Sequence, residues 1–393
     1  MSSNDWEQRK FADFTWDAGK RNKEDLDLEP YAITNEHGFI RQRDAHDDFG
    51  YMKDTDRKAY NIVQPNSFAY NPARINVGSI GYYKGVENVI VSSLYEVFQT
   101  DNYVNDRFLW HWLKSDEFPR WIEKLQEGSV RLYFYYDKLC ECQLYMPSLE
   151  EQEKIASFLD DLDNLITLHQ RKCEETKTLK KYMLQKMFPQ NGHSVPEIRF
   201  SGFTEDWEQR KLSELGQIMT GSTPSTSKSE YYSEDGIPWV TPTDIEATTI
   251  LDTPRKLSEE GAKVGRVVPA NTILCTCIAS IGKNTLLMVK GSFNQQINSL
   301  TPYEENDAYF LLTESELWSN KMKRMAASGT MQIVNKTEFS ELQTMVPKSA
   351  EQKQIGSYFR NLDHLITLHH RKQNYVLNTL IYAKTTLFIT KTS

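Results

Sequence analysis

The chain has 393 residues, more than one ordinary hydrophobic core supports, and its length favours two or three domains. Hydrophobic residues make up 39% and charged residues 25%, as in folded proteins, which argues against extensive disorder. The formal net charge of -8 argues against a nucleic-acid binder that is basic over its whole surface, although a local basic face stays compatible with it.

No segment approaches the run of about 20 apolar residues that a membrane span requires, and the polar start MSSNDWEQRK has no apolar signal-peptide core. We therefore expect a cytoplasmic protein that does not bind membranes. The five cysteines, at 140, 142, 173, 275 and 277, include no CxxC pair, so we expect buried free thiols and no metal site.

The sequence repeats itself with a period of about 200 residues. Residues 147–172 and 347–372 agree at 14 of 26 positions, and the segment DWEQRK at 5–10 returns at 206–211. The tripeptide Ser-Ile-Gly at 79–81 returns at 280–282. The chain is therefore one unit written twice, and each unit is predicted to have two parts.

The first part of each unit, residues 1–146 and 207–346, is predicted to be a mixed, mainly β domain. Runs of β-branched and aromatic residues at 88–98, 130–136 and 272–280 are typical of strands, and the segment 107–127 has a helical pattern of apolar residues. A linker at 191–206 precedes the second of these domains.

The second part of each unit, residues 147–190 and 347–393, is predicted to be a long helix with one apolar seam. Its apolar residues recur at alternating steps of four and three, the heptad pattern of packed helices. Because one helix cannot bury such a seam alone, the two helices are expected to pack antiparallel as a coiled-coil spacer. The sequence thus predicts an α+β fold with approximate two-fold symmetry. The expected seam residues are Ile155, Leu159, Leu162, Ile166, Ile355, Phe359, Leu362 and Ile366.

Several segments in combination resemble a known family. They are GIPWV at 236–240, FNQQI at 293–297, SGTMQIVNKTEF at 328–339, and the pattern Pro-x-x-x-Glu-Gln-x-x-Ile that begins both long helices. Together they resemble the specificity (S) subunits of type I restriction-modification systems over essentially the whole chain. The first domain lacks GIPWV and FNQQI and looks like another sequence class of the same domain, which implies that the two domains read different half-sites.

The resemblance implies a subunit that has no catalytic centre and is not an enzyme. Its two target recognition domains would each read one half of a split sequence in double-stranded DNA, with the helical spacer between them. It would recruit two methyltransferase (M) subunits, which bind S-adenosylmethionine, and restriction (R) subunits, which use ATP and Mg. The chain itself is then expected to need no cofactor.

DNA-contacting residues are expected in polar loops and beside turns. Hydroxyl groups and a lysine in the loop at 220–232 suit phosphate contacts, and the amide side chains at 292–299 present the donor and acceptor pair that adenine requires in the major groove. Structural hydrogen bonding or a solvated surface charge is the alternative at each position. The candidates are Lys20, Arg21, Arg41, Arg43, Arg74, Ser79, Lys84, Thr223, Ser225, Lys228, Lys283, Asn294, Gln295, Gln296, Thr330 and Gln332.

Two other functions stay open. One is a self-contained adenine methyltransferase or nuclease, because YNPARIN at 70–76 resembles the Asn-Pro-Pro-Tyr signature of adenine methyltransferases. Ala73 replaces the second proline, however, and no Gly-rich loop for S-adenosylmethionine precedes it. The other is a coiled-coil scaffold that binds only proteins, which a salt-dependent affinity for duplex DNA would contradict.

Overall fold

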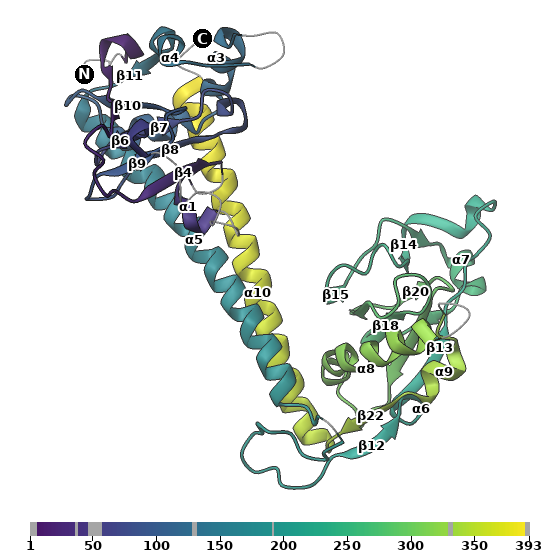
Figure 1. The fold of residues 1–393 in the computed structure, drawn as a ribbon. Coiled ribbons are helices and arrows are strands. Elements are labelled where there is room, and N and C mark those ends of the chain that lie inside the picture. The colour runs from purple at the N-terminus through teal and green to yellow at the C-terminus, as the bar shows by residue number, and fades with distance from the viewer. Residues whose placement is uncertain are drawn as a thin grey trace. The chain divides into compact units, whose positions relative to one another are not determined.

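The computed structural model describes residues 6–35, 38–45, 57–127, 132–190, 192–328 and 333–389. The chain divides into two compact units (Figure 1). Unit 1 consists of Met1–His169 with Lys372–Ser393, and unit 2 consists of Gln170–Arg371. Among the described residues, no helix is both long enough and apolar enough to span a bilayer.

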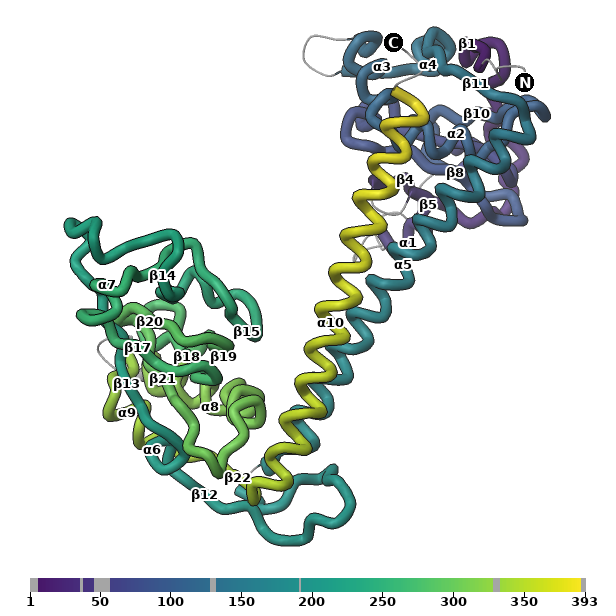
Figure 2. Tube along the Cα trace, turned by 180° about the vertical axis from the view of Figure 1, so that it is seen from behind, coloured from purple at the N-terminus to yellow at the C-terminus, as the bar shows by residue number. Residues whose placement is uncertain are grey.

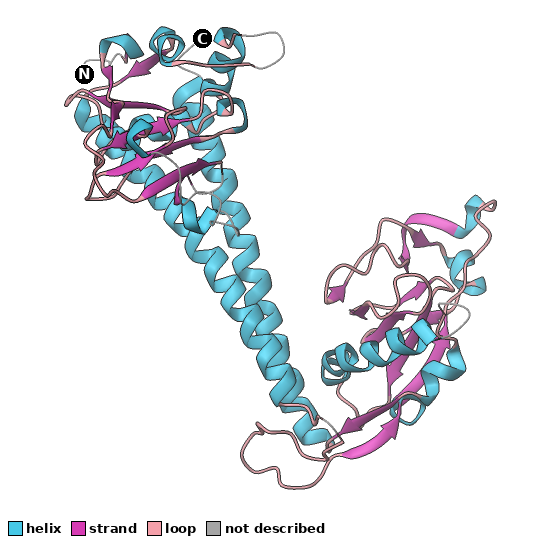
Figure 3. Ribbon diagram, viewed as in Figure 1, coloured by secondary structure: helices cyan, strands magenta, loops and turns pink. Residues whose placement is uncertain are grey.

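Unit 1 contains the first mixed domain, in which two twisted sheets carry short helices (Figure 3). One sheet has the order β3-β6-β9-β4-β5 and the other β2-β10-β7-β8, and β1 pairs with β11 separately. The strands are β1 Glu7–Lys10, β2 Thr15–Asp17, β3 Lys20–Arg21, β4 Pro30–Thr34, β5 Gly38–Arg41, β6 Asn61–Val63, β7 Phe68–Tyr70, β8 Ile80–Tyr82, β9 Val89–Val91, β10 Glu96–Thr100 and β11 Gln143–Met146. The α-helices are α1 Gln42–Ala45, α2 Asp106–Leu113, α3 Glu117–Leu125 and α4 Tyr136–Glu141, with short 3-10 turns at Phe11–Asp13, Arg57–Ala59 and Ile75–Val77.

Unit 2 contains the second mixed domain, which also has two main sheets. Their orders are β13-β21-β18-β19-β15 and β16-β14-β20-β17, and β12 pairs with β22 separately. The strands are β12 Glu208–Lys211, β13 Gly216–Thr220, β14 Tyr232–Val240, β15 Thr249–Ile250, β16 Lys256–Leu257, β17 Val267–Val268, β18 Thr272–Thr276, β19 Asn284–Leu287, β20 Gly291–Phe293, β21 Ile297–Pro302 and β22 Gln343–Val346. The helices are α6 Leu212–Leu215, α7 Glu259–Val264, α8 Ala308–Ser328 and α9 Lys336–Glu341, with a 3-10 turn at Ser229–Tyr231.

Two long helices, α5 (Leu149–Lys186) and α10 (Ser349–Lys384), each begin in one unit and end in the other. They lie side by side in both views (Figures 1 and 2). The start of α5 shares the core of unit 1 with the end of α10, and the start of α10 shares the core of unit 2 with the end of α5, so the helices are antiparallel. The predicted α+β class, with two mixed domains and two long antiparallel helices, is confirmed.

The last four residues of the repeated segment DWEQRK form the strand that closes each domain beside its long helix. β1 pairs with β11 from Glu7 opposite Met146 to Lys10 opposite Gln143, and β12 pairs with β22 in the same way. The repetition is therefore structural, because the same short ladder recurs in both units.

The repeated Glu-Gln pair anchors each long helix to its domain. The buried Gln152 donates to the carbonyl of Pro147 (3.0 Å), and its Oε1 accepts from the backbone N–H of Asn105 (2.8 Å), the residue before α2. Gln352 makes the equivalent bonds to Pro347 (2.9 Å) and to Asp307 (3.0 Å), the residue before α8. Each buried glutamine is thus hydrogen-bonded on both sides, and it ties the first turn of the long helix to the residue before a helix of the domain.

An aromatic cluster at the end of the partner helix completes each unit. In unit 1 the ring of Phe388 lies 5.6 Å from that of Phe108 in an edge-to-face arrangement, beyond the end of α10 in a π-helical turn, Thr385–Ile389. In unit 2 the ring of Phe188 lies 5.6 Å from that of Phe310. Each repeat thus supplies the end of its long helix to the core of the other repeat's domain.

The predicted seam residues lie mainly within these cores. Leu159, Ile355, Phe359 and Leu362 are buried, whereas Ile155, Leu162 and Ile166 are partly buried against the core of unit 1. Ile366 is half-buried, and its carbonyl accepts from the thiol of Cys173 at 3.8 Å.

One strand prediction is wrong. Of the segment 130–136, residues 132–136 are described, and Tyr133 forms only an isolated bridge with Glu127 before α4 begins. The buried Phe134 donates its backbone N–H to the carbonyl of Pro72 (3.1 Å), so the segment is held by core contacts and a loop rather than by a sheet. The segment 88–98 is divided by a turn at Ser92 into β9 and β10.

Candidate nucleic-acid interface

The loop at 220–232 and the amide-rich segment at 292–299 meet in the second domain. The backbone N–H of Gly221 donates to the carbonyl of Ile297 (3.0 Å), and that of Ser222 donates to the carbonyl of Phe293 (3.0 Å). Thr223 donates its hydroxyl to Oε1 of Gln295. A Cβ on Gly221 would lie 2.1 Å from the carbonyl oxygen of Asn294, so this close approach requires glycine. The structure brings these two predicted segments into one surface.

The three amides of this surface have different environments. Asn294 is buried, and its Oδ1 accepts from the backbone N–H of Gln296 (3.0 Å) while its Nδ2 donates to Oε1 of the same residue (3.2 Å). Asn294 therefore shapes the turn. Gln295 is exposed and Gln296 partly exposed, so these two side chains are the ones placed to meet a ligand.

Lysine and hydroxyl side chains lie farther along the same loop. Lys228 is exposed, and its ammonium lies 3.2 Å from the hydroxyl of Tyr231 and 5.1 Å from the centre of that ring. The hydroxyl of Ser225 lies 2.8 Å from that of Ser227. Both groups stay at the surface, where a phosphate would meet them.

Arg266 is a residue that sequence reasoning missed. Its backbone N–H donates to the hydroxyl of Ser222 (3.0 Å), and its guanidinium donates to the carbonyl of Thr220 (2.7 Å), so it holds the start of the loop from a distant part of the chain. Periodicity could not reveal it, since only the tertiary fold places it there.

Of the other candidates in the second domain, Lys283 lines a cavity of about 370 Å³ together with Lys180 and Glu316. Thr330 and Gln332 lie outside the described residues. After that segment, the backbone N–H of Val334 donates to the carbonyl of Cys277 (2.9 Å).

The first domain does not gather its candidates into one cluster. Lys20 and Arg21 lie on β3 and Arg41 on β5, the opposite edges of the five-stranded sheet. Arg21 donates to the carbonyl of Ala59 (2.6 Å), and Arg43 pairs with Glu29 at 3.7 Å.

The other first-domain candidates also have separate surroundings. Arg74 is exposed at the turn before Ile75–Val77, and Arg41 lies 3.4 Å from the hydroxyl of Tyr31. Ser79 is buried and donates its hydroxyl to the carbonyl of Ile33 (2.9 Å), which leaves this hydroxyl engaged inside the domain. We therefore leave Ser79 out of the proposed interface. The next candidate along the chain, Lys84, belongs to a separate charged cluster.

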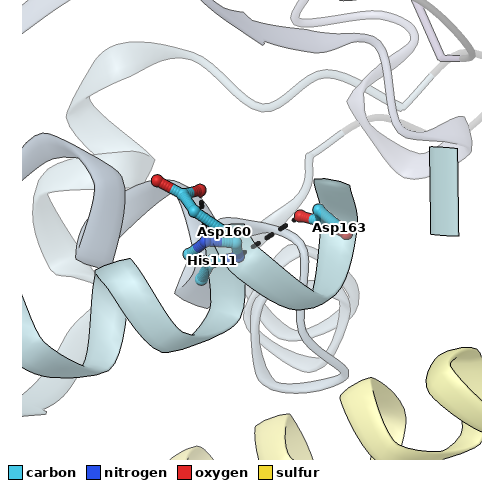
Figure 4. Close-up of side chains that lie close together, drawn as sticks. All are labelled: His111, Asp160 and Asp163. Atoms are coloured by element: carbon cyan, nitrogen blue, oxygen red, sulfur yellow. Dashed lines mark hydrogen bonds and ion pairs between the residues drawn. The ribbon is translucent and has the colours of Figure 1, made fainter. Parts of the chain in front are cut away.

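That cluster lies between α2, α5 and α10, and its centre is the fully buried His111 (Figure 4). Nε2 of His111 lies 2.9 Å from Asp160, and Nδ1 lies 3.8 Å from Asp163. Arg107 binds both carboxylate oxygens of Asp160, with its Nε at 3.0 Å. Burial, and to a lesser extent Lys384, lower the pKa of His111 to about 4, so the imidazole is neutral at pH 7.

Single atoms of His111, Asp160 and Asp163 lie within 4.8 Å of one another, close enough to hold a metal ion. Arg107 already occupies Asp160, and the ammonium groups of Lys84 and Lys384 act on both carboxylates. A divalent cation would have to displace or oppose three cationic side chains. We therefore assign no metal to these residues.

The segment YNPARIN is a turn. Oδ1 of Asn71 accepts from the backbone N–H of Ala73 (3.0 Å), and the backbone N–H of Arg74 donates to the carbonyl of Asn71 (2.9 Å). The asparagine side chain that a methyltransferase would turn toward the base is thus used to shape the local backbone.

A family comparison accounts for the repeat. The family model of the type I restriction modification DNA specificity domain matches residues 4–178 and again residues 204–378. The chain belongs to this family. The predicted resemblance to type I specificity subunits is confirmed, and such subunits are the non-catalytic members of their systems.

Individual relatives of the specificity-subunit family extend over most of the chain. The HindI specificity subunit of Haemophilus influenzae is 22% identical, over 90% of this chain and 93% of the relative. The putative MjaX specificity subunit of Methanocaldococcus jannaschii is also 22% identical, over 95% of this chain and 90% of the relative.

Solved structures of the same kind show the fold. The S subunit of a type I restriction-modification system from M. genitalium matches with a TM-score of 0.65 at 14% identity, covering 99% of this chain and 97% of that one. A second structure, from work on complex assembly and conformational transition of the type I R-M system, matches with a TM-score of 0.52 at 15% identity, covering 97% of each chain.

Proposed function

We propose that this specificity subunit reads a bipartite sequence in double-stranded DNA, one half-site for each recognition domain. The observation that carries the proposal is the reciprocal helix pair, in which each long helix begins beside one domain and ends in the core of the other unit. A domain mounted through a buried aromatic cluster and a buried glutamine is held more firmly than one on a flexible linker.

The helix pair would act as a ruler. α5 has 38 residues and α10 has 36, so each is about 55 Å long at 1.5 Å per residue. Half-sites read from one face of B-DNA lie about one turn, roughly 34 Å, apart or at a related phase. The length of the helix pair therefore suits a fixed separation between two half-sites.

The helix pair also offers equivalent surfaces to two M subunits. Tyr182 on α5 and Tyr382 on α10 occupy matching positions of the repeat and are 49% and 73% exposed, respectively. Phe158 on α5 and Tyr375 on α10 are also exposed. Exposed aromatic side chains among charged ones are typical of protein interfaces. We propose that M subunits dock here and that R subunits join through the resulting complex.

The chemistry would belong to the partners. S-adenosylmethionine would bind to the M subunits, and ATP and Mg to the R subunits, while this chain supplies recognition and needs no cofactor. The complex would act in the cytoplasm on the cell's own and on incoming DNA.

The proposal is tested by mapping methylated adenines in cells that carry the chain with its M partner. We expect a split motif with one fixed internal spacing. Exchanging residues 207–346 for another such domain should alter one half-site only. An undivided motif, or methylation that does not depend on this chain, would overturn the bipartite proposal.

The ruler is tested by removing one heptad from each helix, residues 168–174 and 368–374, which are equivalent in the repeat. The deletion shortens the pair by about 10 Å, or roughly three base pairs at 3.4 Å each, and leaves the phase of the seam nearly unchanged. The half-sites should stay the same and their preferred spacing should shrink. An unchanged spacing contradicts the ruler.

The interface of the second domain is tested by Gln295→Ala and Lys228→Ala in the assembled complex. Loss of the Gln295 amide should reduce the discrimination against the wrong base at one position of the half-site by about 1–3 kcal/mol. Loss of the lysine should weaken binding to all sequences alike and reduce its salt dependence, while Lys228→Arg retains both. Equal effects of the two alanine variants on sequence preference and on salt dependence would refute the proposal that Gln295 reads a base and Lys228 contacts phosphate.

Affinity for duplex DNA also separates this proposal from a scaffold that binds only proteins. The complex of the chain with M subunits should bind duplex DNA with an affinity that falls steeply with salt.

A further inference from the structure

Each recognition domain rests on its own long helix through one helix of the domain, α2 on α5 and α8 on α10. The equivalent positions of α2 and α8 follow from the glutamine anchors, since Asn105 and Asp307 donate their backbone N–H groups to Gln152 and Gln352. Phe108 and Phe310 are then equivalent, and both are fully buried. By the same alignment, Arg107 of α2 corresponds to Tyr309 of α8.

The contact of α2 with α5 is an ion pair. Arg107 binds both oxygens of Asp160, and the two side chains are only 21% and 28% exposed. His111, one turn later on α2, places Nε2 2.9 Å from the same carboxylate (Figure 4). In this contact α5 thus contributes the carboxylate of Asp160, and the domain contributes the side chains of Arg107 and His111 that bind it.

In the contact of α8 with α10, the long helix carries the opposite charge at the position of Asp160. The repeat places Arg360 at the position of Asp160. The guanidinium of Arg360 lies 4.9 Å from the centre of the Tyr309 ring, and the hydroxyl of Tyr309 donates to Asp363 (2.9 Å). A second bond holds Asp363, because Lys180 of α5 lies 2.9 Å from it. Here the long helix presents the Arg360 cation to the tyrosine ring and the Asp363 carboxylate to its hydroxyl, and the domain supplies no charge to this contact.

We propose that these two contacts, which we call the key, favour the packing of each recognition domain on its own long helix and disfavour its packing on the other long helix. Seating the first domain on α10 would bring the guanidinium of Arg107 against that of the exposed Arg360, two like charges that repel each other. Seating the second domain on α5 would place a tyrosine beside Asp160, which would lose both charge-assisted hydrogen bonds. The inference goes beyond the proposed function, because it holds whether or not the chain reads DNA.

The key is tested in the full-length chain by hydrogen exchange of the amides of α2. Asp160→Arg should raise their exchange rates at least tenfold, because Arg107 and the new arginine repel each other. Adding Arg107→Tyr recreates the pair found in unit 2, with Asp163 at the position of Asp363, and should restore the rates to within about threefold. Mere loss of packing could not be rescued in this way. Equal exchange in the single and double variants would overturn the proposal.

Unit 2 provides the reciprocal test if Asp160→Arg prevents folding. Arg360 is exposed, so Arg360→Asp is expected to fold. This substitution should raise the hydrogen-exchange rates of the α8 amides at least fivefold, because the new carboxylate faces the ring of Tyr309 and lies near Asp363. Tyr309→Arg in the same chain should reverse the effect. Failure of the second substitution to reverse the first would contradict the key.

A hybrid chain tests rejection directly. In it, a copy of residues 207–346 replaces residues 1–146, so that α8 rests on α5. The hybrid should protect the amides of the inserted α8 at least tenfold better with Asp160→Arg than with Asp160. Equal protection in the two hybrids would show that the contact does not discriminate between domains. Because no DNA is present, neither result depends on the proposed function.

Discussion

Removing the ring of Phe388 should destabilise unit 1, although this residue lies near the end of the sequence. Phe388 is 3% exposed, and its ring contacts Phe108 in the core of the first domain. Replacing a buried phenylalanine by alanine costs about 3–5 kcal/mol, from lost transfer energy and from the cavity left behind. Domains are stable by only about 5–15 kcal/mol, so Phe388→Ala should remove roughly a fifth or more of the stability of unit 1.

The assay is guanidinium unfolding combined with hydrogen exchange, which reports on each unit separately. Phe388→Ala should speed exchange in α2 and leave α8 unchanged, whereas Phe188→Ala, at the equivalent position, should do the reverse. Tyr382→Ala is the matched control, because this side chain is 73% exposed near the end of α10 and its loss should change stability by less than about 0.5 kcal/mol. If Phe388→Ala behaves like Tyr382→Ala, or if its effect falls on α8, the reciprocal exchange of helix ends is refuted.

Three further predictions concern buried groups. Burial raises the pKa of Glu314 to about 8 from an ordinary value of 4.5, so the native state retains a proton that the unfolded state loses. The stability of unit 2 should therefore fall by up to about 1.4 kcal/mol per pH unit between these values, and Glu314→Gln should abolish that slope in unfolding measured at pH 5 and pH 8. The pKa of His111 is lowered from 6.5 to about 4, so the unfolded state takes up this proton first as the pH falls. Unit 1 should lose about 2 kcal/mol by pH 5 through this group, and His111→Gln should remove that loss in acid unfolding. Gly221→Ala places a methyl group 2.1 Å from the carbonyl oxygen of Asn294, which should separate the two loops and lower DNA affinity at least tenfold without changing the exchange of α2; unchanged affinity would contradict the proposed surface.

The long helices could be predicted because the packed face of a helix shows a periodic pattern of apolar residues in the sequence. Leu159 and Phe359 follow a four-three spacing, and both are buried. The repeat marked the segment DWEQRK in both units, although neither its strand conformation nor its partner strand could be predicted from the repeat. The segment 130–136 shows the limit of such reasoning, because aromatic and β-branched residues fill a buried loop as readily as a strand.

Much of the candidate site could not be predicted, because it depends on residues distant in sequence. Nothing around Arg266 marks it as a partner of the loop at 220–232. His111 lies in a segment that reads as an ordinary amphipathic helix, and its relation to Asp160 exists only after α2 packs on α5. Ser79 shows the converse, since a hydroxyl beside a turn has no sequence mark that separates a surface contact from a buried one.

The placement of Phe388 bears on the order in which the chain folds during synthesis. Unit 2 is one continuous segment, Gln170–Arg371, whereas unit 1 needs residues from both ends of the chain. Phe108 and Phe388 are 280 residues apart (388 − 108), which a ribosome takes roughly 15 to 55 s to add at 5–20 residues per second. The first domain to leave the ribosome is therefore the last to be completed. Until then, the apolar surface that Phe388 covers stays open to chaperones, proteases and other nascent chains.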